Sequence, residues 1–222
     1  MRARWVTSTK ADGDFRVGLP ADELAARRRA FVDLPWVWLR QVHGSAVVVV
    51  DADNWAAVCG TEADALVTAS PGLALAVHTA DCVPVVVSSP DGVIGVAHAG
   101  WRGLAAGVID ATVEAMEGLG TRRERLHIEL GPHIGPECYE FGATELAAVE
   151  ARIGTAAGLR ARTAAGALAL DLRAAVTAAA RQAGVPVTAL RSAPCTSCWS
   201  ECYFSHRARG ESGRMATVAW LS

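Results

Sequence analysis

The chain has 222 residues, of which 51% are hydrophobic and 20% charged, and this composition excludes both a disordered chain and a membrane protein. Its formal net charge of −2 argues against a nucleic-acid-binding surface, which would need clustered lysines and arginines in excess. We therefore expect a soluble globular protein with small-molecule partners, and a single domain over residues 1–222. We interpret two arginine-rich stretches, Arg27–Arg29 and Arg122–Arg125, as solvated faces.

The N-terminal residues and the cysteines indicate a cytoplasmic protein. The opening MRARWVTSTK has basic side chains but lacks the apolar stretch of a signal peptide. No uncharged apolar run reaches the roughly 18 residues that a membrane span needs. We expect the six cysteines to be mostly reduced thiols with packing, metal-binding or reactive roles, rather than disulfides.

Apolar runs rich in β-branched residues alternate with alanine-rich segments of helical period, which is typical of a mixed α/β fold. In chain order the first expected strands are Ala46–Val50, Leu73–His78, Val83–Ser88 and Val93–His98. A helix is predicted next over Leu104–Leu119, with Gly120 as its C-terminal stop, and then a strand over Leu126–Leu130.

The C-terminal half continues the alternation. A second helix is predicted from an N-cap at Thr144 to Gly154, and the segment Thr155–Ala169 is expected to be a flexible hairpin or loop. A third helix is framed by Asp171 and Gly184. The last expected strands are Val187–Leu190 and Ala216–Leu221.

Polar residues gather where predicted strands begin or end, and His43, Cys82 and His98 are the metal-binding candidates among them. No local spacing marks them as ligands, and each alone is more typical of a structural histidine or a core cysteine. The Gly-Trp-Arg-Gly that follows His98 changes this balance, because it supplies tight turns, an apolar wall and a guanidinium suited to phosphate or carboxylate. Two imidazoles and one thiolate suit zinc and leave a fourth position open for water or substrate. Copper is the main competitor, but none of the three methionines is placed like the axial ligand of a blue-copper centre.

A second cysteine pattern near the C-terminus, Cys195-Thr-Ser-Cys198 followed by Cys202, has one CxxC pair and lacks the second pair of a closed zinc site. A metal knuckle is therefore the less favoured interpretation. The favoured one is that Cys195 packs in a turn while Cys198 and Cys202 are half-exposed, redox-sensitive thiols.

Together these segments resemble the YfiH-type laccase-domain family, once named multicopper polyphenol oxidoreductases and now linked to purine nucleoside phosphorylase activity. The resemblance covers most of the chain from about Trp38. It rests on QVHG at Gln41–Gly44, EADALVT at Glu62–Thr68, TADCVPV at Thr79–Val85, HAGWRG at His98–Gly103, GPHIGPECYEFG at Gly131–Gly142, DLR at Asp171–Arg173, and CT, YFSHR and GRMA near the C-terminus.

This resemblance implies a single-domain four-layer α/β/β/α sandwich with mixed sheets, and it places His43, Cys82 and His98 on the family's metal ligands, with zinc as cofactor and copper as the alternative. It also implies phosphorolysis of adenosine, inosine, guanosine or methylthioadenosine, and deamination of adenosine. By residue, it makes Asp81 a candidate for proton transfer or for orienting a ligand, and Cys82 part of the catalytic centre. The candidates for phosphate or substrate contacts are Arg102, Arg207 and Arg214, and those for the pocket lining are Gln41, His133 and Phe204.

Three other functions stay open. The first is a copper-dependent polyphenol oxidase, although a multicopper centre needs more histidines than the six in this chain. The second is a cysteine-dependent amidase of cell-wall peptides with Cys82 as nucleophile. The third is a non-catalytic metal-binding protein, because Thr9–Gly13 replaces the Thr-Arg-x-Gly-Gly-like loop that the family usually carries.

Overall fold

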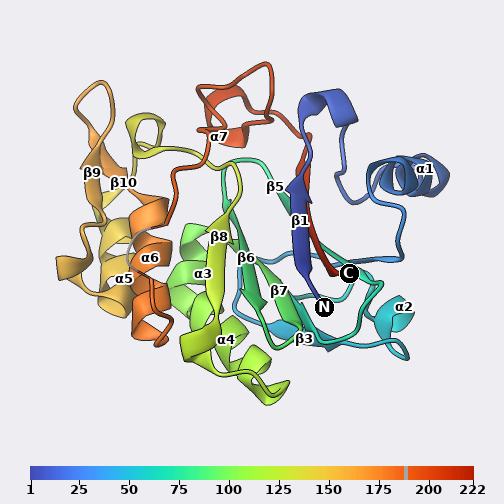
Figure 1. The fold of residues 1–222 in the computed structure, drawn as a ribbon. Coiled ribbons are helices and arrows are strands. Elements are labelled where there is room, and N and C mark those ends of the chain that lie inside the picture. Colours follow the sequence, from blue (N-terminus) through green and yellow to red (C-terminus); the bar gives the residue numbers. More distant parts are fainter. Residues whose placement is uncertain (188–189) are drawn as a thin grey trace.

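The computed structural model describes residues 1–187 and 190–222, which form two larger mixed sheets, a small hairpin and flanking helices (Figure 1). The first sheet has the strand order β1-β11-β5-β2 and the second has the order β3-β4-β7-β6-β8. Two pairs, β2 with β5 and β3 with β4, are parallel, and the other pairs of these sheets are antiparallel. The bounds of the strands are β1 Ala3–Thr7, β2 Trp36–Trp38, β3 Val47–Val50, β4 Ala65–Thr68, β5 Ala74–Thr79, β6 Val83–Ser89, β7 Val93–Ala99, β8 His127–Leu130 and β11 Met215–Leu221.

The helices cover the outer faces of the two sheets, and Figure 1 shows α3 to α6 together on one side and α1 on the other. Their bounds are α1 Ala21–Phe31, α2 Trp55–Val58, α3 Trp101–Ala106, α4 Val108–Gly118, α5 Ala143–Ile153, α6 Leu172–Gln182 and α7 His206–Arg209. The hairpin of β9 (Arg160–Arg162) and β10 (Leu168–Leu170) follows α5. Short 3₁₀ turns lie at Lys10–Asp12 (η1), Arg123–Arg125 (η2), Pro136–Cys138 (η3) and Thr155–Ala157 (η4). None of the described helices is long and apolar enough to cross a membrane.

Three buried clusters show how the layers pack. Successive side chains of a strand point to opposite faces, so each central strand contributes to two clusters. In β5, Leu75 and Val77 face the second sheet, whereas Ala74 and Ala76 pack with Phe15 and the α1 side. In the second sheet the opposite face of β6 and β7 packs on α4, α5 and α6. The order helix, sheet, sheet, helices is that of an α/β/β/α sandwich.

Most predicted strands are confirmed, with shifts of one residue at several ends. The predicted strand Val187–Leu190 includes residues 188–189, which lie outside the described residues. The segment Thr155–Ala169, expected to be a hairpin or a loop, contains η4 and most of the β9–β10 hairpin.

Two helix predictions need correction. The helix predicted over Leu104–Leu119 is two helices, because Gly107 adopts a left-handed conformation (φ +87°) that caps α3 and begins α4. The second helix has Gly142 rather than Thr144 at its N-cap, so Thr144 lies in the first turn of α5.

The interpretation of Arg27–Arg29 as a solvated face is wrong for Arg28. Its guanidinium lies over the rings of Trp36 and Trp38, 5.6 and 5.0 Å from their centroids. Burial lowers the pKa of Arg28 to about 10, although the Cys59 thiol nearby acts in the opposite direction. The helix pattern alone did not show that this arginine covers the edge strand β2.

Candidate active site and metal centre

A cavity of about 620 Å³ opens where several strand ends meet, a size typical of small-molecule sites. Residues from β5, from the turn between β5 and β6, from the end of β7 and from α7 line it. The lining comprises Arg16, Val17, Leu39, Arg40, Gln41, His43, His78, Thr79, Ala80, Asp81, Cys82, His98, Trp101, Arg102, Tyr139, His206, Arg207 and Arg214. Most of the residues that the sequence singled out as site candidates are therefore in one place.

The structure brings His43, Cys82 and His98 together at this cavity. Their ligand atoms all lie within 4.8 Å of one another, and Cys82 Sγ is 3.9 Å from His43 Nε2. Zn–S and Zn–N bonds of about 2.3 and 2.0 Å imply a separation of roughly 3.5 Å in a tetrahedral centre, so a small adjustment would suffice. His43 is exposed, Cys82 is partly buried and His98 is buried, which places the open side of the trio towards the cavity.

Asp64 orients this trio, and the sequence analysis did not identify it. Its carboxylate is fully buried and accepts a hydrogen bond from His98 Nδ1 at 2.8 Å. The same carboxylate accepts from the backbone N–H groups of Val42, His43 and Gly44 at 3.2, 2.9 and 2.6 Å. Asp64 therefore fixes the ring of His98, leaves Nε2 of that ring for a metal, and holds the loop that carries His43. The available signal was an acidic residue directly before the apolar run of β4.

The charges of the trio favour the ionised thiol. Burial alone would raise the pKa of Cys82, but His98 and His43 beside it lower the pKa to about 6. Burial would likewise lower the pKa of His98, whereas the Cys82 thiolate and the Asp64 carboxylate raise it to about 9. At neutral pH the donor set thus includes the thiolate that a metal ligand requires. The chemistry and geometry of these residues fit a transition metal.

The backbone at the site is strained and closely packed. His43 and Asp81 are the non-glycine residues of the described chain with positive φ, at +59° and +93°. A Cβ at Gly100 would lie 2.9 Å from His43 Cδ2 and 3.0 Å from Cys82 Sγ. Glycine is therefore required directly after β7, because any side chain there would displace two of the candidate ligands.

Asp81 holds the C-terminal segment against the site. Oδ1 accepts a hydrogen bond from Thr196 Oγ1, and Oδ2 accepts one from the backbone N–H of Arg207, both at 2.6 Å. Because both oxygens are engaged, the geometry favours a positioning role for Asp81 over proton transfer. The two roles predicted from the resemblance, proton transfer and orientation of a ligand, stay predictions.

Arginines give the cavity a positive character. Within the described residues, Arg102, Arg207 and Arg214 form no ion pair with a carboxylate. Arg102 lies over the ring of Trp101 at 4.4 Å and Arg207 over that of Tyr139 at 4.6 Å. Their charges are available to an anion that enters the cavity.

Two buried polar side chains in the lining have no hydrogen-bond partner among the described residues. Neither ring nitrogen of His78 is bonded, and neither is Thr79 Oγ1. Burial, with the charges of Arg28, His98 and Arg214, lowers the pKa of His78 to about 3, so its ring is neutral. Because unpaired buried polar groups are costly, these atoms are candidates for substrate contacts.

The remaining predicted lining residues differ in position. Gln41 lines the cavity, and its side-chain amide bonds both backbone groups of His78, at 2.8 and 2.7 Å. His133 and Phe204 are not among the lining residues. His133 is buried with Nδ1 2.9 Å from Gly131 O, and the backbone N–H of Phe204 donates to Met215 Sδ. Their predicted pocket role has no support in this geometry.

Comparison with known proteins assigns the family. A family model described as multi-copper polyphenol oxidoreductase laccase matches residues 11–222. The chain belongs to this laccase-domain family. A purine nucleoside phosphorylase of Xylella fastidiosa is 43% identical over 188 residues, which cover 83% of this chain and 71% of the relative. Purine nucleoside phosphorylase SCO2081 of Streptomyces coelicolor is 44% identical over 200 residues, which cover 90% of this chain and 80% of the relative.

Solved structures of laccase-domain relatives share the fold. The Bacillus licheniformis protein YfiH superposes with a TM-score of 0.88 at 26% identity, covering 99% of this chain and 93% of its own. YlmD from Geobacillus stearothermophilus has a TM-score of 0.87 at 29% identity, covering 98% and 91%. The mixed α/β fold predicted from the sequence pattern and the resemblance to the YfiH-type family are both confirmed.

The family's description names copper, and a set of two imidazoles and one thiolate suits copper as well as zinc. Among the described residues, the groups that could hold a metal include two histidines, His43 and His98. A multicopper centre would need several more imidazoles. The trio therefore supports a single metal ion with an open position.

Proposed function

We propose that this protein is a zinc-dependent purine nucleoside phosphorylase that accepts adenosine, inosine, guanosine and methylthioadenosine, and that it also deaminates adenosine. The observation that carries the proposal is the trio of His43, Cys82 and His98 beside a cavity that Arg102, Arg207 and Arg214 make positive. A phosphorolytic enzyme must bind phosphate next to a nucleoside, and the cavity has both the charge and the volume for this. The names of the relatives support the same reaction.

The arginines would bind phosphate and orient it. A guanidinium offers a planar pair of N–H donors that matches two phosphate oxygens. Arg102 and Arg207 are held by aromatic rings and Arg214 by backbone carbonyls, so little side-chain entropy is lost when the anion binds. We assign these three residues to phosphate.

The purine would contact His78 and Thr79. The neutral imidazole of His78 has one donor and one acceptor nitrogen, and Thr79 Oγ1 can act as either. The ring nitrogens and exocyclic groups of a purine offer complementary partners. Satisfying these buried atoms would favour a purine over an apolar ligand of the same size.

His43, Cys82 and His98 would hold the zinc ion, and a bound metal with an open fourth position supplies Lewis-acid polarisation of a substrate oxygen or water. Asp64 would keep His98 and the His43 loop in place, and Asp81 would keep Arg207 at the rim. Water is excluded from the back of the site by the buried strand ends of β5 and β7.

We also propose that residues 1–222 form one domain, because the three cores share strands of the same two sheets. The location would be the cytoplasm, in keeping with the six free cysteines.

The test is base release from inosine and adenosine by the zinc-loaded protein with and without phosphate, followed by chromatography of base, sugar phosphate and inosine. We expect release to require phosphate and to produce ribose 1-phosphate. Arg102→Met should raise the KM for phosphate about tenfold or more, because it removes a charged hydrogen-bond donor. Arg29→Met on the exposed face of α1 is the matched control and should change nothing. Equal base release without phosphate would point to a hydrolase and refute phosphorolysis.

Two alternatives have specific observations in their favour. The family description favours a copper-dependent polyphenol oxidase, which predicts oxygen-dependent oxidation of phenols by the copper-loaded protein. The Cys82 thiolate beside His98 would also suit a cysteine amidase, which predicts that alkylation of Cys82 abolishes activity in protein already stripped of metal. A non-catalytic metal-binding protein would bind zinc and turn over none of these substrates.

A further inference from the structure

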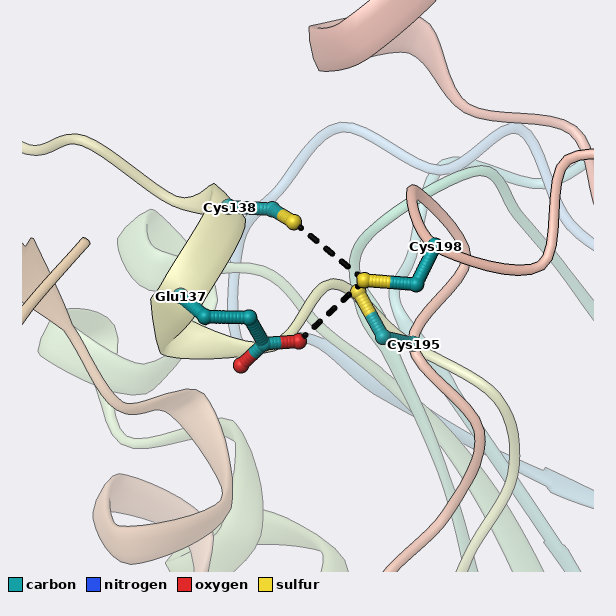
Figure 2. A group of neighbouring side chains, drawn as sticks. All are labelled: Glu137, Cys138, Cys195 and Cys198. Carbon is teal, nitrogen blue, oxygen red and sulfur yellow. Dashed lines mark hydrogen bonds between the residues drawn. The ribbon is translucent and has the colours of Figure 1, made fainter. Parts of the chain in front are cut away.

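A second group of metal-binding side chains lies outside the cavity. Glu137 and Cys138 come from η3, and Cys195 and Cys198 come from the segment before α7 (Figure 2). Their ligand atoms all lie within 4.8 Å of one another. None of the four lines the cavity.

The separations match those around a small tetrahedral cation. Cys138 Sγ is 3.4 Å from Cys198 Sγ, and Cys198 Sγ is 3.6 Å from Glu137 Oε1. Zn–S bonds of about 2.3 Å and Zn–O bonds of about 2.0 Å imply ligand separations of roughly 3.8 Å between two sulfurs and 3.5 Å between sulfur and oxygen. In Figure 2 the three sulfurs and the carboxylate point towards a common centre.

The surrounding backbone supports this convergence. Trp199 N–H bonds Cys195 O at 3.0 Å, so the CxxC segment forms a turn that places both thiols on one side. The backbone N–H of Gly135 donates to Cys195 Sγ at 3.2 Å, which stabilises a thiolate. A Cβ at Gly135 would collide with the Glu137 carboxylate, so glycine leaves the space into which this carboxylate turns.

Thiols this close to one another and to a carboxylate disfavour each other's ionisation, whereas a bound cation would stabilise all of them in the charged, metal-binding form. Three Cys and one Glu also complete four ligands, which is the closed arrangement of a structural zinc site. Cys138 and Cys195 are partly buried, and Cys198 is exposed, so the ion would sit at the surface end of the two segments.

We propose that Glu137, Cys138, Cys195 and Cys198 bind a second, structural zinc ion that fastens the C-terminal segment to the loop after β8. Both segments reach the cavity. Cys138 precedes Tyr139 of the lining, and Cys195 precedes Thr196, which bonds Asp81. The bonds from His133 N–H to Pro194 O and from Thr196 N–H to His133 O already join the two segments, and zinc would close this junction. The ion would affect substrate binding indirectly, by fixing the positions of the two segments that reach the cavity.

The main test is zinc content by elemental analysis of the full chain purified without chelator. We expect Cys198→Ser to lose about one zinc per chain relative to the wild type, as one closed site predicts. Cys202→Ser is the matched control, because it is the same substitution four residues further along the chain, at a cysteine outside the group. Unchanged zinc in Cys198→Ser would overturn the proposal. So would a Cys138–Cys198 disulfide found by mass spectrometry after alkylation under native conditions.

A second measurement leaves the proposed ligands intact. Cys82→Ala removes the thiolate of the first site, so any cobalt–thiolate absorption of this variant comes from the second group. A cobalt-loaded sample should still show the intense charge-transfer absorption of a site with several cysteines. Absence of that absorption would refute the second site even if Cys198→Ser failed to fold. Neither result depends on nucleoside turnover, so the phosphorylase proposal can fail while this one stands.

Discussion

Asp64→Asn tests whether the buried carboxylate organises the metal-binding trio. Each carboxylate oxygen accepts two hydrogen bonds: Oδ1 from His98 Nδ1 and the His43 N–H, and Oδ2 from the Val42 and Gly44 N–H groups. In asparagine one oxygen becomes an NH₂ group, which cannot accept. Whichever way the amide turns, two donors lose their acceptor.

The magnitude follows from the two lost bonds. Hydrogen bonds to a charged group contribute about 1.5–3 kcal/mol each, so the two bonds together set a range of roughly 3–6 kcal/mol. Local relaxation and water entry reduce the loss, and we expect the free energy of unfolding to fall by about 3 kcal/mol. Because the carboxylate also orients a ligand, zinc affinity at the first site should fall about 10–100-fold.

The assays are urea unfolding and zinc competition against a chromophoric chelator. Both are made in a protein that also carries Cys198→Ser as the background, so that zinc binding reports on the first site alone. Asp53→Asn is the control, because Asp53 is exposed and its side chain forms no hydrogen bond within the described residues. A zinc affinity of Asp64→Asn within twofold of the background would show that this carboxylate does not position the ligands.

Three further predictions follow from the structure. Gly100→Ala should abolish zinc binding at the first site, because the new Cβ displaces two candidate ligands. Gly118→Ala is the control: a Cβ there meets nothing within 4 Å, so this variant should retain zinc and gain up to about 1 kcal/mol of stability from helix propensity. Equal zinc content in the two variants would contradict the packing argument. Burial would raise the pKa of Glu211, but Lys10, the Ser205 N–H and Arg209 lower it to about 2, so its contribution is complete above pH 4.5 and disappears as the pH falls towards 2. Glu211→Gln should therefore unfold about 1–3 kcal/mol more easily at pH 7 and match the wild type near pH 2, as measured by denaturant titration. Removal of all metal with a chelator should lower the melting temperature by several degrees in calorimetry, and zinc should restore it; identical melting curves would mean that metal does not bind the folded state selectively.

The strands that could be predicted are rich in consecutive β-branched residues, such as β3 with its four valines and β6 with Val85–Val87. The missed strands lack that signal. In β4 (Ala65–Thr68) only the last two residues are β-branched, and β2 (Trp36–Trp38) has a single valine between two tryptophans. In β1 (Ala3–Thr7), Val6 and Thr7 follow an arginine and a tryptophan. The break at Gly107 was hidden because apolar residues keep helical spacing on both sides of it, although the left-handed glycine starts a new helix.

The position of the first candidate site was predictable in outline because its candidate ligands stand beside strand ends with glycine and arginine nearby. Its supporting residues were not, since a single sequence does not show that Asp64 accepts hydrogen bonds from a loop 20 residues away. The second group was missed for the same reason. Cys138 lies 60 residues before Cys198, and only the fold supplies the third thiol and the carboxylate that the CxxC pattern lacked.

The two candidate metal sites are joined through one short path of contacts. Cys195 of the second group is followed by Thr196, which bonds Asp81, and Asp81 is followed by Cys82 of the first. Asp81 has a positive φ, a conformation that costs about 1–3 kcal/mol in a non-glycine residue and persists only when its surroundings hold it. The bonds from Thr196 and from the Arg207 N–H to its carboxylate hold it, together with the bond from Ile134 N–H to its backbone oxygen. Fixing the C-terminal segment therefore determines both where the Cys82 thiolate points and where the Arg207 charge stands, so a structural ion outside the cavity would control the geometry inside it.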